Sequence, residues 1–146
     1  EEYYTWKTYS LDGNPVTASN GVEITVDCSV RELDDADVTL LCTGLDVERL
    51  PLDPELGKRL RKLNSRGRTY GSICTGAYLL ARYHLLDGRR CTIHWENIAS
   101  LREEFPDVQV CDDLFLIDRE RITAQLDRRV GSRDGYHKTG RWRVGG

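Results

Sequence analysis

The chain has 146 residues, of which 39% are hydrophobic and 31% charged, and its formal net charge is -3. A composition this apolar and this evenly mixed in sign excludes a disordered segment and predicts one folded domain. The negative charge gives no general reason to bind nucleic acid, and no apolar run approaches the roughly 20 residues that cross a bilayer. We therefore expect a cytoplasmic protein with no membrane anchor and no DNA contact through this segment alone.

The cysteine pattern bears on redox state and metal binding. The count is odd and no CxxC spacing occurs among Cys28, Cys42, Cys74, Cys91 and Cys111. This argues against both a disulfide framework and a zinc knuckle, so we expect reduced thiols and neither a metal nor a cofactor. The pair Asp112-Asp113 is either a metal site or a solvated turn, and the turn is favoured.

The first part of the chain predicts short β elements. Residues 3–9 alternate aromatic or β-branched with polar side chains, which predicts a strand that ends at a turn over residues 11–15. Residues 15–18 and 22–26 flank Ser19-Asn20-Gly21, where Asn-Gly supplies the positive φ values of a tight hairpin. We expect a small hairpin beside the main sheet.

The rest of the chain alternates strand and helix patterns. A continuous apolar run predicts a buried parallel strand over 37–42, and Pro54 and Gly67 bracket a helix over 54–63. The other expected helices cover 77–83 and 95–105, and the other expected strands cover 69–73, 91–93, 108–110, 114–117 and 121–123. This alternation predicts an α/β fold with a mostly parallel central sheet covered on both faces.

The segment Gly71-Ser72-Ile73-Cys74-Thr75-Gly76-Ala77 places a thiol between a buried strand and a helix start. Such an elbow pushes the side chain out of the chain path, and the helix dipole favours the thiolate. The N–H of Thr75 and a second N–H from the Gly44-Leu45 turn are candidates to hold an oxyanion or a ligand carboxylate. We expect the pocket at the carboxyl ends of the strands.

His94 and Trp95 follow the expected strand 91–93 and are the other candidates for this site. A base at a strand end is placed to reach the thiol of Cys74. The alternative is that Cys74 is a buried small residue and His94 caps the next helix. The remaining cysteines are interpreted as inert thiols, and His84 and His137 as solvent-facing side chains.

The stretches GSICTGAYLLA (71–81), LLDGRRCTIHW (85–95) and ENIASLREEFP (96–106) resemble the ThiJ/PfpI superfamily, which is class I glutamine amidotransferase-like. Together with residues 4–21 they are most similar to the amino-terminal domain of GlxA-type, AraC-family transcriptional regulators. The resemblance implies a flavodoxin-like three-layer sandwich, often dimeric, that senses a small molecule. DNA binding belongs in that family to a separate carboxy-terminal helix-turn-helix domain, which this chain lacks.

The chain departs from the family at both ends. The family begins with a further strand and helix, which carry an acidic partner of the cysteine in catalytic relatives, and it ends with a small-residue turn and an apolar helix. Neither pattern occurs here, so the first and last elements of the fold are expected to be missing. We assign residues 1–123 to a partial sensing domain and 124–146 to an atypical basic tail, which a shifted reading frame would explain.

Two functions follow from the resemblance, and a damaged remnant without activity is a third interpretation, because both ends of the family domain are expected to be missing. The leading one is a ligand-sensing domain of a homodimeric regulator, for a quaternary amine such as glycine betaine or carnitine, or for an amino acid such as arginine. Its pocket would use Gly44, Leu45, Cys74, Thr75, His94 and Trp95. The alternative is a cysteine-dependent enzyme, such as an isonitrile hydratase or a deglycase-like hydrolase, with Cys74 as nucleophile and His94 as supporting base.

Overall fold

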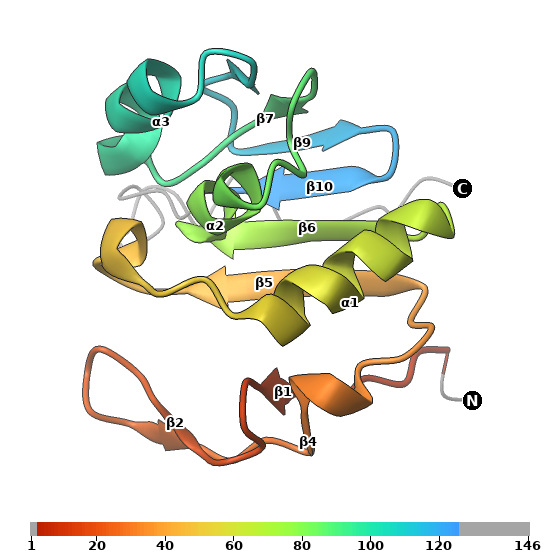
Figure 1. Ribbon diagram of the computed structural model, residues 1–146. Coiled ribbons are helices and arrows are strands. Elements are labelled where there is room, and N and C mark those ends of the chain that lie inside the picture. Colours follow the sequence, from red (N-terminus) through yellow and green to blue (C-terminus); the bar gives the residue numbers. More distant parts are fainter. Residues whose placement is uncertain (1–2, 126–146) are drawn as a thin grey trace.

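A four-stranded sheet forms the centre of the fold in the computed structural model, which describes residues 3–125 (Figure 1). Its strand order is β5-β6-β10-β9. Three strands run parallel and β9 runs antiparallel to β10. The bounds are β5 (Val38–Thr43), β6 (Thr69–Cys74), β9 (Phe115–Asp118) and β10 (Arg121–Ala124). The mostly parallel sheet expected from the sequence is confirmed.

Two helices, α1 (Pro54–Ser65) and α2 (Gly76–Arg82), cover one face of this sheet (Figure 1). The carboxylate of Asp53 caps α1 by accepting a hydrogen bond of 2.8 Å from the N–H of Leu56. Leu56, Leu60 and Leu63 recur at helical spacing and are buried, because they form the stripe that faces the sheet. The apolar residues of α2 complete this core, in which Leu80 has no exposed surface.

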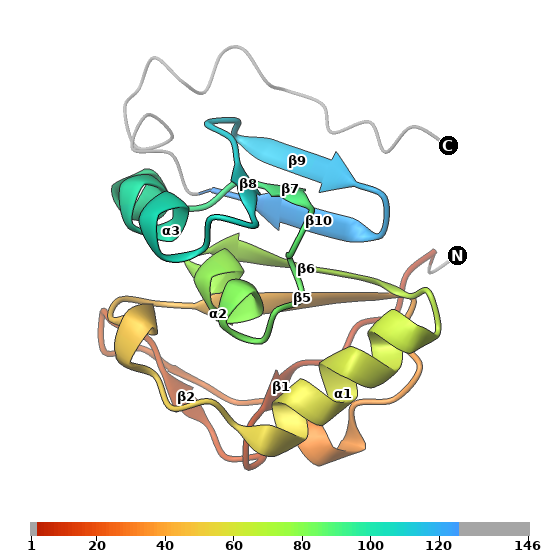
Figure 2. The ribbon, with the colours of Figure 1, turned by 45° about the horizontal axis from the view of Figure 1, so that its top comes forward.

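The segment after α2 differs in detail from its prediction. One helix was expected over 95–105, but the structure has a 3-10 turn, η3 (Trp95–Asn97), followed by α3 (Ile98–Glu104). A parallel pair of short strands, β7 (Arg90–Cys91) and β8 (Gln109–Val110), flanks them. Figure 2 shows α3 next to β8, against which it packs.

The amino-terminal part forms a separate layer of short elements. The Asn20-Gly21 hairpin is confirmed: β2 (Val16–Thr17) and β3 (Glu23–Ile24) pair antiparallel, and Gly21 has φ +85°. A second pair, β1 (Tyr9–Ser10) and β4 (Cys28–Ser29), is parallel. It leads into the 3-10 turn η1 (Val30–Glu32), and a similar turn, η2 (Val47–Arg49), follows β5.

The strand expected over residues 3–9 is wrong apart from Tyr9. Residues 3–8 have no regular structure, and Tyr3 and Trp6 are 83% and 90% exposed. Thr8 binds the carboxylate of Asp27 through its N–H, at 2.7 Å, and through its hydroxyl. Alternating aromatic residues form a strand only where a ladder and an apolar surface receive them, and the pairing of this segment with β4 begins only at Tyr9.

The second face of the central sheet was expected to be covered and strand 37–42 to be buried. The burial of strand 37–42 is wrong, because Val38 and Leu40 are 52% and 44% exposed. Within residues 3–125, α1 and α2 lie on the other face of the sheet (Figures 1 and 2). Side chains alternate along a strand, and those that point away from α1 and α2 are exposed. We call them the open sheet face: Val38, Leu40, Cys42, Ile73, Phe115 and Ile117.

The end of the described chain bears on the domain boundary. Ala124 is still paired in β10, with Ile73 on β6 and Phe115 on β9. The predicted tail therefore starts inside a strand at Ala124, and its residues 126–146, including His137, lie outside the described residues. Among the helices within residues 3–125, none combines the length and the apolar character needed to cross a membrane.

Candidate functional site

Cys74 lies at a sharp turn between β6 and α2. Its φ is +61°, in the left-handed region that non-glycine residues rarely adopt. Gly76 follows because a Cβ at this position would lie 2.8 Å from both the carbonyl oxygen of Leu41 and the Cβ of Ser72. The turn therefore has the strained strand-to-helix geometry of a nucleophile elbow, and the thiol is half-buried at its apex.

Thr75, the N-cap residue of α2, joins the elbow to the loop that follows β5. Its hydroxyl donates a hydrogen bond of 2.7 Å to the carbonyl oxygen of Gly44. The hydroxyl of Thr43 lies 2.8 Å from the same Thr75 oxygen, which has one proton and is therefore left to accept from Thr43. Thr75 is 3% exposed, so these bonds are shielded from water and hold the 43–45 loop beside Cys74.

His94 reaches the elbow through its backbone. Its N–H donates a hydrogen bond of 3.0 Å to the carbonyl oxygen of Cys74. His94 occupies the N-cap position of η3, but its side chain makes no capping hydrogen bond; its carbonyl oxygen accepts from the N–H of Asn97. The imidazole is thus not used as a helix cap, and it lies beside the indole of Trp95 with ring centroids 5.7 Å apart.

The structure brings together four of the six predicted site residues: Gly44, Cys74, Thr75 and His94. The other two, Leu45 and Trp95, directly follow Gly44 and His94 in the chain and are 72% and 38% exposed. Within residues 3–125, the N–H groups of Gly44 and Thr75 have no backbone partner outside regular helices and strands. Both N–H groups lie just beyond the carboxyl ends of β5 and β6.

Two residues at this site were not predicted to contribute. The hydroxyl of Thr43 makes one of the two hydrogen bonds of the Thr75 hydroxyl. In the sequence, the position of Thr43 at the end of an apolar strand was the signal that could have indicated this role. Cys42, interpreted as inert, is adjacent to the elbow because it pairs with Ile73 on β6. Cys42 is exposed, but partial burial of its sulfur, followed by the neighbouring Cys74, raises the pKa of its thiol.

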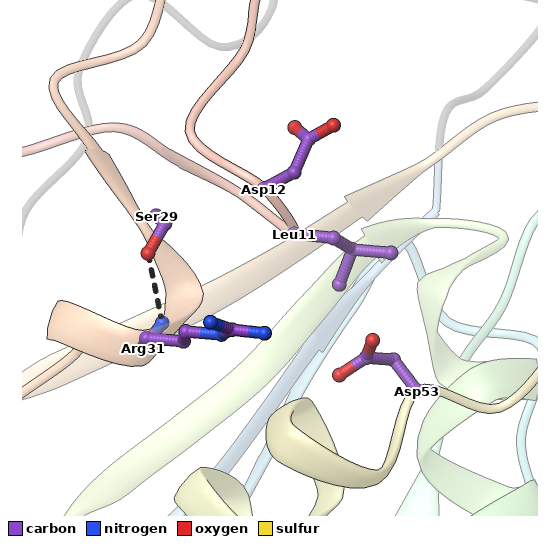
Figure 3. Close-up of a pocket in the computed structure, with 5 residues that line it drawn as sticks. All are labelled: Leu11, Asp12, Ser29, Arg31 and Asp53. Atoms are coloured by element: carbon purple, nitrogen blue, oxygen red, sulfur yellow. Dashed lines mark hydrogen bonds between the residues drawn. The ribbon is translucent and has the colours of Figure 1, made fainter.

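A separate cavity lies on the amino-terminal side of the molecule (Figure 3). It has a volume of about 350 Å³ and is lined by Leu11, Asp12, Ser29, Arg31 and Asp53. None of these belongs to the elbow or to the predicted site. The Asp12 and Asp53 carboxylates already accept hydrogen bonds from Asn14 and Leu56, so both are occupied by local backbone contacts.

The other singled-out residues have structural surroundings. Cys91 is fully buried, whereas Asp112 and Asp113 are exposed. His84 is exposed and its Nδ1 lies 3.3 Å from the Asp87 carboxylate. No group of three or more metal-binding side chains occurs in the part of the chain that the structure describes.

A mostly parallel sheet in which one strand ends at a strained cysteine elbow defines a class of α/β proteins. Comparison with known sequences identifies this class. The sequence profile of the DJ-1/PfpI family matches residues 1–129, and the chain belongs to this family. The flavodoxin-like fold expected from the ThiJ/PfpI resemblance is thereby confirmed.

Several curated relatives are transcriptional regulators. The HTH-type transcriptional regulators GbdR and CdhR of Pseudomonas aeruginosa are 41% and 42% identical over 123 residues, which is 84% of this chain and 33% and 36% of theirs. The chain thus spans about a third of the length of these relatives. An isonitrile hydratase from Pseudomonas putida is 30% identical over 93 residues, covering 64% of this chain and 39% of that enzyme.

Among solved structures, an AraC family transcriptional regulator from Pseudomonas putida superposes with a TM-score of 0.70 and 33% identity. The match covers 86% of this chain and 67% of that one. DJ-1beta from Drosophila melanogaster superposes with a TM-score of 0.68 and 25% identity, covering 78% and 62%. The resemblance to GlxA-type, AraC-family regulators is also confirmed, since a GlxA regulator of Rhizobium meliloti is 30% identical over 106 residues.

Proposed function

We propose that this chain is the ligand-sensing domain of an AraC-type transcriptional regulator. The observation that carries the proposal is the pair of hydrogen bonds that join Thr75 to Gly44 and His94 to Cys74 and so bring three separate loops together. The identity to GbdR and CdhR over 84% of the chain supports a regulator rather than an enzyme. DNA binding would reside in a helix-turn-helix domain outside this chain, acting as a cytoplasmic homodimer.

The ligand would be a quaternary amine or an amino acid. Glycine betaine, carnitine and arginine all carry a carboxylate. The N–H groups of Gly44 and Thr75 are suited to bind this anionic end. The half-exposed indole of Trp95 suits the cationic end through cation-π attraction. The ligand would therefore lie between the elbow and Trp95.

Isothermal titration with glycine betaine, carnitine and arginine tests this proposal on the chain as it exists. We expect one of these compounds to bind. Trp95→Ala should weaken its binding at least about tenfold, because a cation-π contact that is desolvated in the complex is lost. Trp6→Ala should leave the binding unchanged. Trp6 is the matched control because it is 90% exposed and distant in sequence from the elbow. Equal binding by all three proteins would contradict the placement of the ligand.

A cysteine-dependent enzyme is the second candidate, favoured by the positive φ of Cys74 and by the isonitrile hydratase relative. Cys74 would attack the substrate carbon and His94 would carry the proton. Incubation with an isonitrile, followed by assay of the N-substituted formamide, separates the two functions. Turnover that Cys74→Ala abolishes would replace the sensor by the enzyme, whereas amine binding that survives Cys74→Ala without turnover supports the sensor.

A further inference from the structure

Cys42 and Cys74 are diagonal neighbours on adjacent strands. In the β5–β6 register Cys42 pairs with Ile73 and Thr43 pairs with Cys74. Strands lie about 4.8 Å apart and rise about 3.3 Å per residue, which places the two Cα atoms roughly 6 Å apart. That separation lies inside the range of about 4.4–6.8 Å over which a disulfide closes.

A diagonal pair normally points its side chains to opposite faces of the sheet. Cys74 departs from this alternation because its φ of +61° turns the residue out of the strand conformation. The thiol of Cys74 is therefore not confined to the face covered by α2.

Both thiols are also open to a small oxidant. Cys42 is exposed on the open sheet face, and Cys74 is half-buried at the apex of the elbow. Cys74 begins the turn into α2 and has a φ of +61°. Accessible thiolates beside a second cysteine are the usual setting of redox-sensing sites.

We propose that Cys42 is the resolving thiol of Cys74 in an oxidative modification by a peroxide. The Cys74 thiol releases its proton and its sulfur attacks one peroxide oxygen; the O–O bond breaks and the leaving oxygen takes up that proton, so that for hydrogen peroxide the products are a sulfenic acid and water. Cys42 then attacks the Cys74 sulfur: the S–S bond forms, the S–O bond breaks, and the hydroxide leaves as water with the Cys42 proton. Two thiols and one hydrogen peroxide thus give one disulfide and two waters.

The chain contains its own control in Cys91 and Cys111. Cys91 pairs with Val110, so Cys111 is its diagonal neighbour with the same offset, and the N–H of Cys111 donates to the Cys91 carbonyl oxygen at 2.8 Å. Neither residue has a positive φ, and Cys91 has no exposed surface. This second pair retains the alternation that the elbow breaks, so it is expected to stay reduced.

The test treats the reduced full chain with one equivalent of hydrogen peroxide at low protein concentration, then labels the remaining thiols with a maleimide after denaturation. Of the five cysteines we expect two to be lost, with a linked peptide pair that contains Cys42 and Cys74. After the same treatment, Cys42→Ser and Cys42→Ala are expected to give no linked peptide pair. Their Cys74 should remain a sulfenic acid, which dimedone labels, whereas in the native chain the disulfide has replaced the sulfenic acid.

Other outcomes would overturn the proposal. One is a linked pair that joins Cys74 to Cys91 or Cys111, and another is equal dimedone labelling of the native chain and both Cys42 variants. A native chain in which Cys74 is not oxidised would also overturn it. The readout is chemical and needs no ligand, so its failure is distinguishable from failure of the proposed sensing function.

Discussion

Arg121 of β10 lies over the ring of Tyr70 of β6, with its Cζ 3.7 Å from the ring centroid. The two residues pair directly in the sheet and are 3% and 0% exposed. The guanidinium also donates to the carbonyl oxygen of Leu85 at 3.1 Å and to the side-chain oxygen of Asn64. A cation removed from water is tolerated here because the ring and these acceptors replace its hydration.

Replacement of this buried cation is expected to destabilise the fold. Arg121→Met would remove the Arg121 donor from the Leu85 carbonyl oxygen and leave the Asn64 amide oxygen with the Tyr70 hydroxyl as its side-chain donor, at a cost of about 2–4 kcal/mol in the free energy of unfolding. Urea unfolding measures the difference. Arg90→Met, at an exposed position of β7, is the control and should change the unfolding free energy by less than about 0.5 kcal/mol.

Thr75 tests whether the elbow needs its tie to the 43–45 loop. Thr75→Val keeps the shape but removes the hydroxyl that contacts Gly44 and Thr43. We expect a stability loss of about 1–3 kcal/mol, because two part-buried hydrogen bonds are lost, together with weaker ligand binding by titration. Thr75→Ser keeps the hydroxyl and should restore binding; if Val and Ser variants bind alike, the tie does not shape the site.

Adjacent residues of β9 test which face of the sheet is the core. Leu116 is 6% exposed and Ile117 is 61% exposed. Leu116→Ala is therefore expected to cost about 2–5 kcal/mol in thermal or urea unfolding, whereas Ile117→Ala should cost much less, within about 1 kcal/mol. Equal costs would show that the open sheet face is covered in solution.

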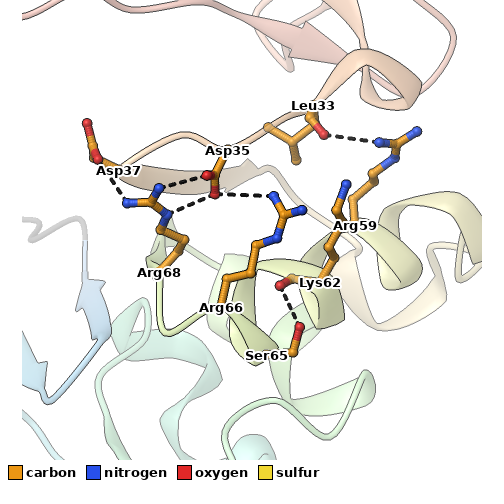
Figure 4. Close-up of polar contacts among 8 residues, drawn as sticks. All are labelled: Leu33, Asp35, Asp37, Arg59, Lys62, Ser65, Arg66 and Arg68. Carbon is orange, nitrogen blue, oxygen red and sulfur yellow. Dashed lines mark hydrogen bonds and ion pairs between the residues drawn. The ribbon is translucent and has the colours of Figure 1, made fainter.

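Asp35 and Arg68 predict a dependence of stability on acid pH (Figure 4). The Arg68 guanidinium binds the Asp35 carboxylate at 2.7 Å and lowers the pKa of Asp35 to about 2. A pKa lowered by folding stabilises the protein above the unfolded value of about 4, and this stabilisation is lost as the pH falls towards 2. Melting temperatures of the native chain and Asp35→Asn should therefore converge between pH 4 and pH 2.

The matched control for this titration is Asp34→Asn, since Asp34 is exposed and makes no ion pair within residues 3–125. Its melting temperature should follow that of the native chain at every pH. Added salt should also reduce the difference caused by Asp35→Asn, because the pair is exposed to solvent. A difference that persists unchanged at pH 2 would contradict the ion pair as its cause.

The sequence predicted the elements with strong local signals. Pro54 and the leucine spacing that follows it located α1, and Asn20-Gly21 located the hairpin, because capping and turn geometry depend on a few neighbouring residues. The glycines around Cys74 located the elbow for the same reason. Residues 3–8 were misjudged because a strand also needs a partner, which local alternation does not supply.

By itself, then, the sequence determined the family, the order of strands and helices, and the cysteine elbow, since each depends on residues close together in the chain. The tertiary structure decided which of these residues meet. The contacts of Thr75 with Gly44 and of His94 with Cys74, and the position of Cys42 beside the elbow, depend on strand register. Register and the covering of one sheet face follow from packing between distant segments, which no local pattern records.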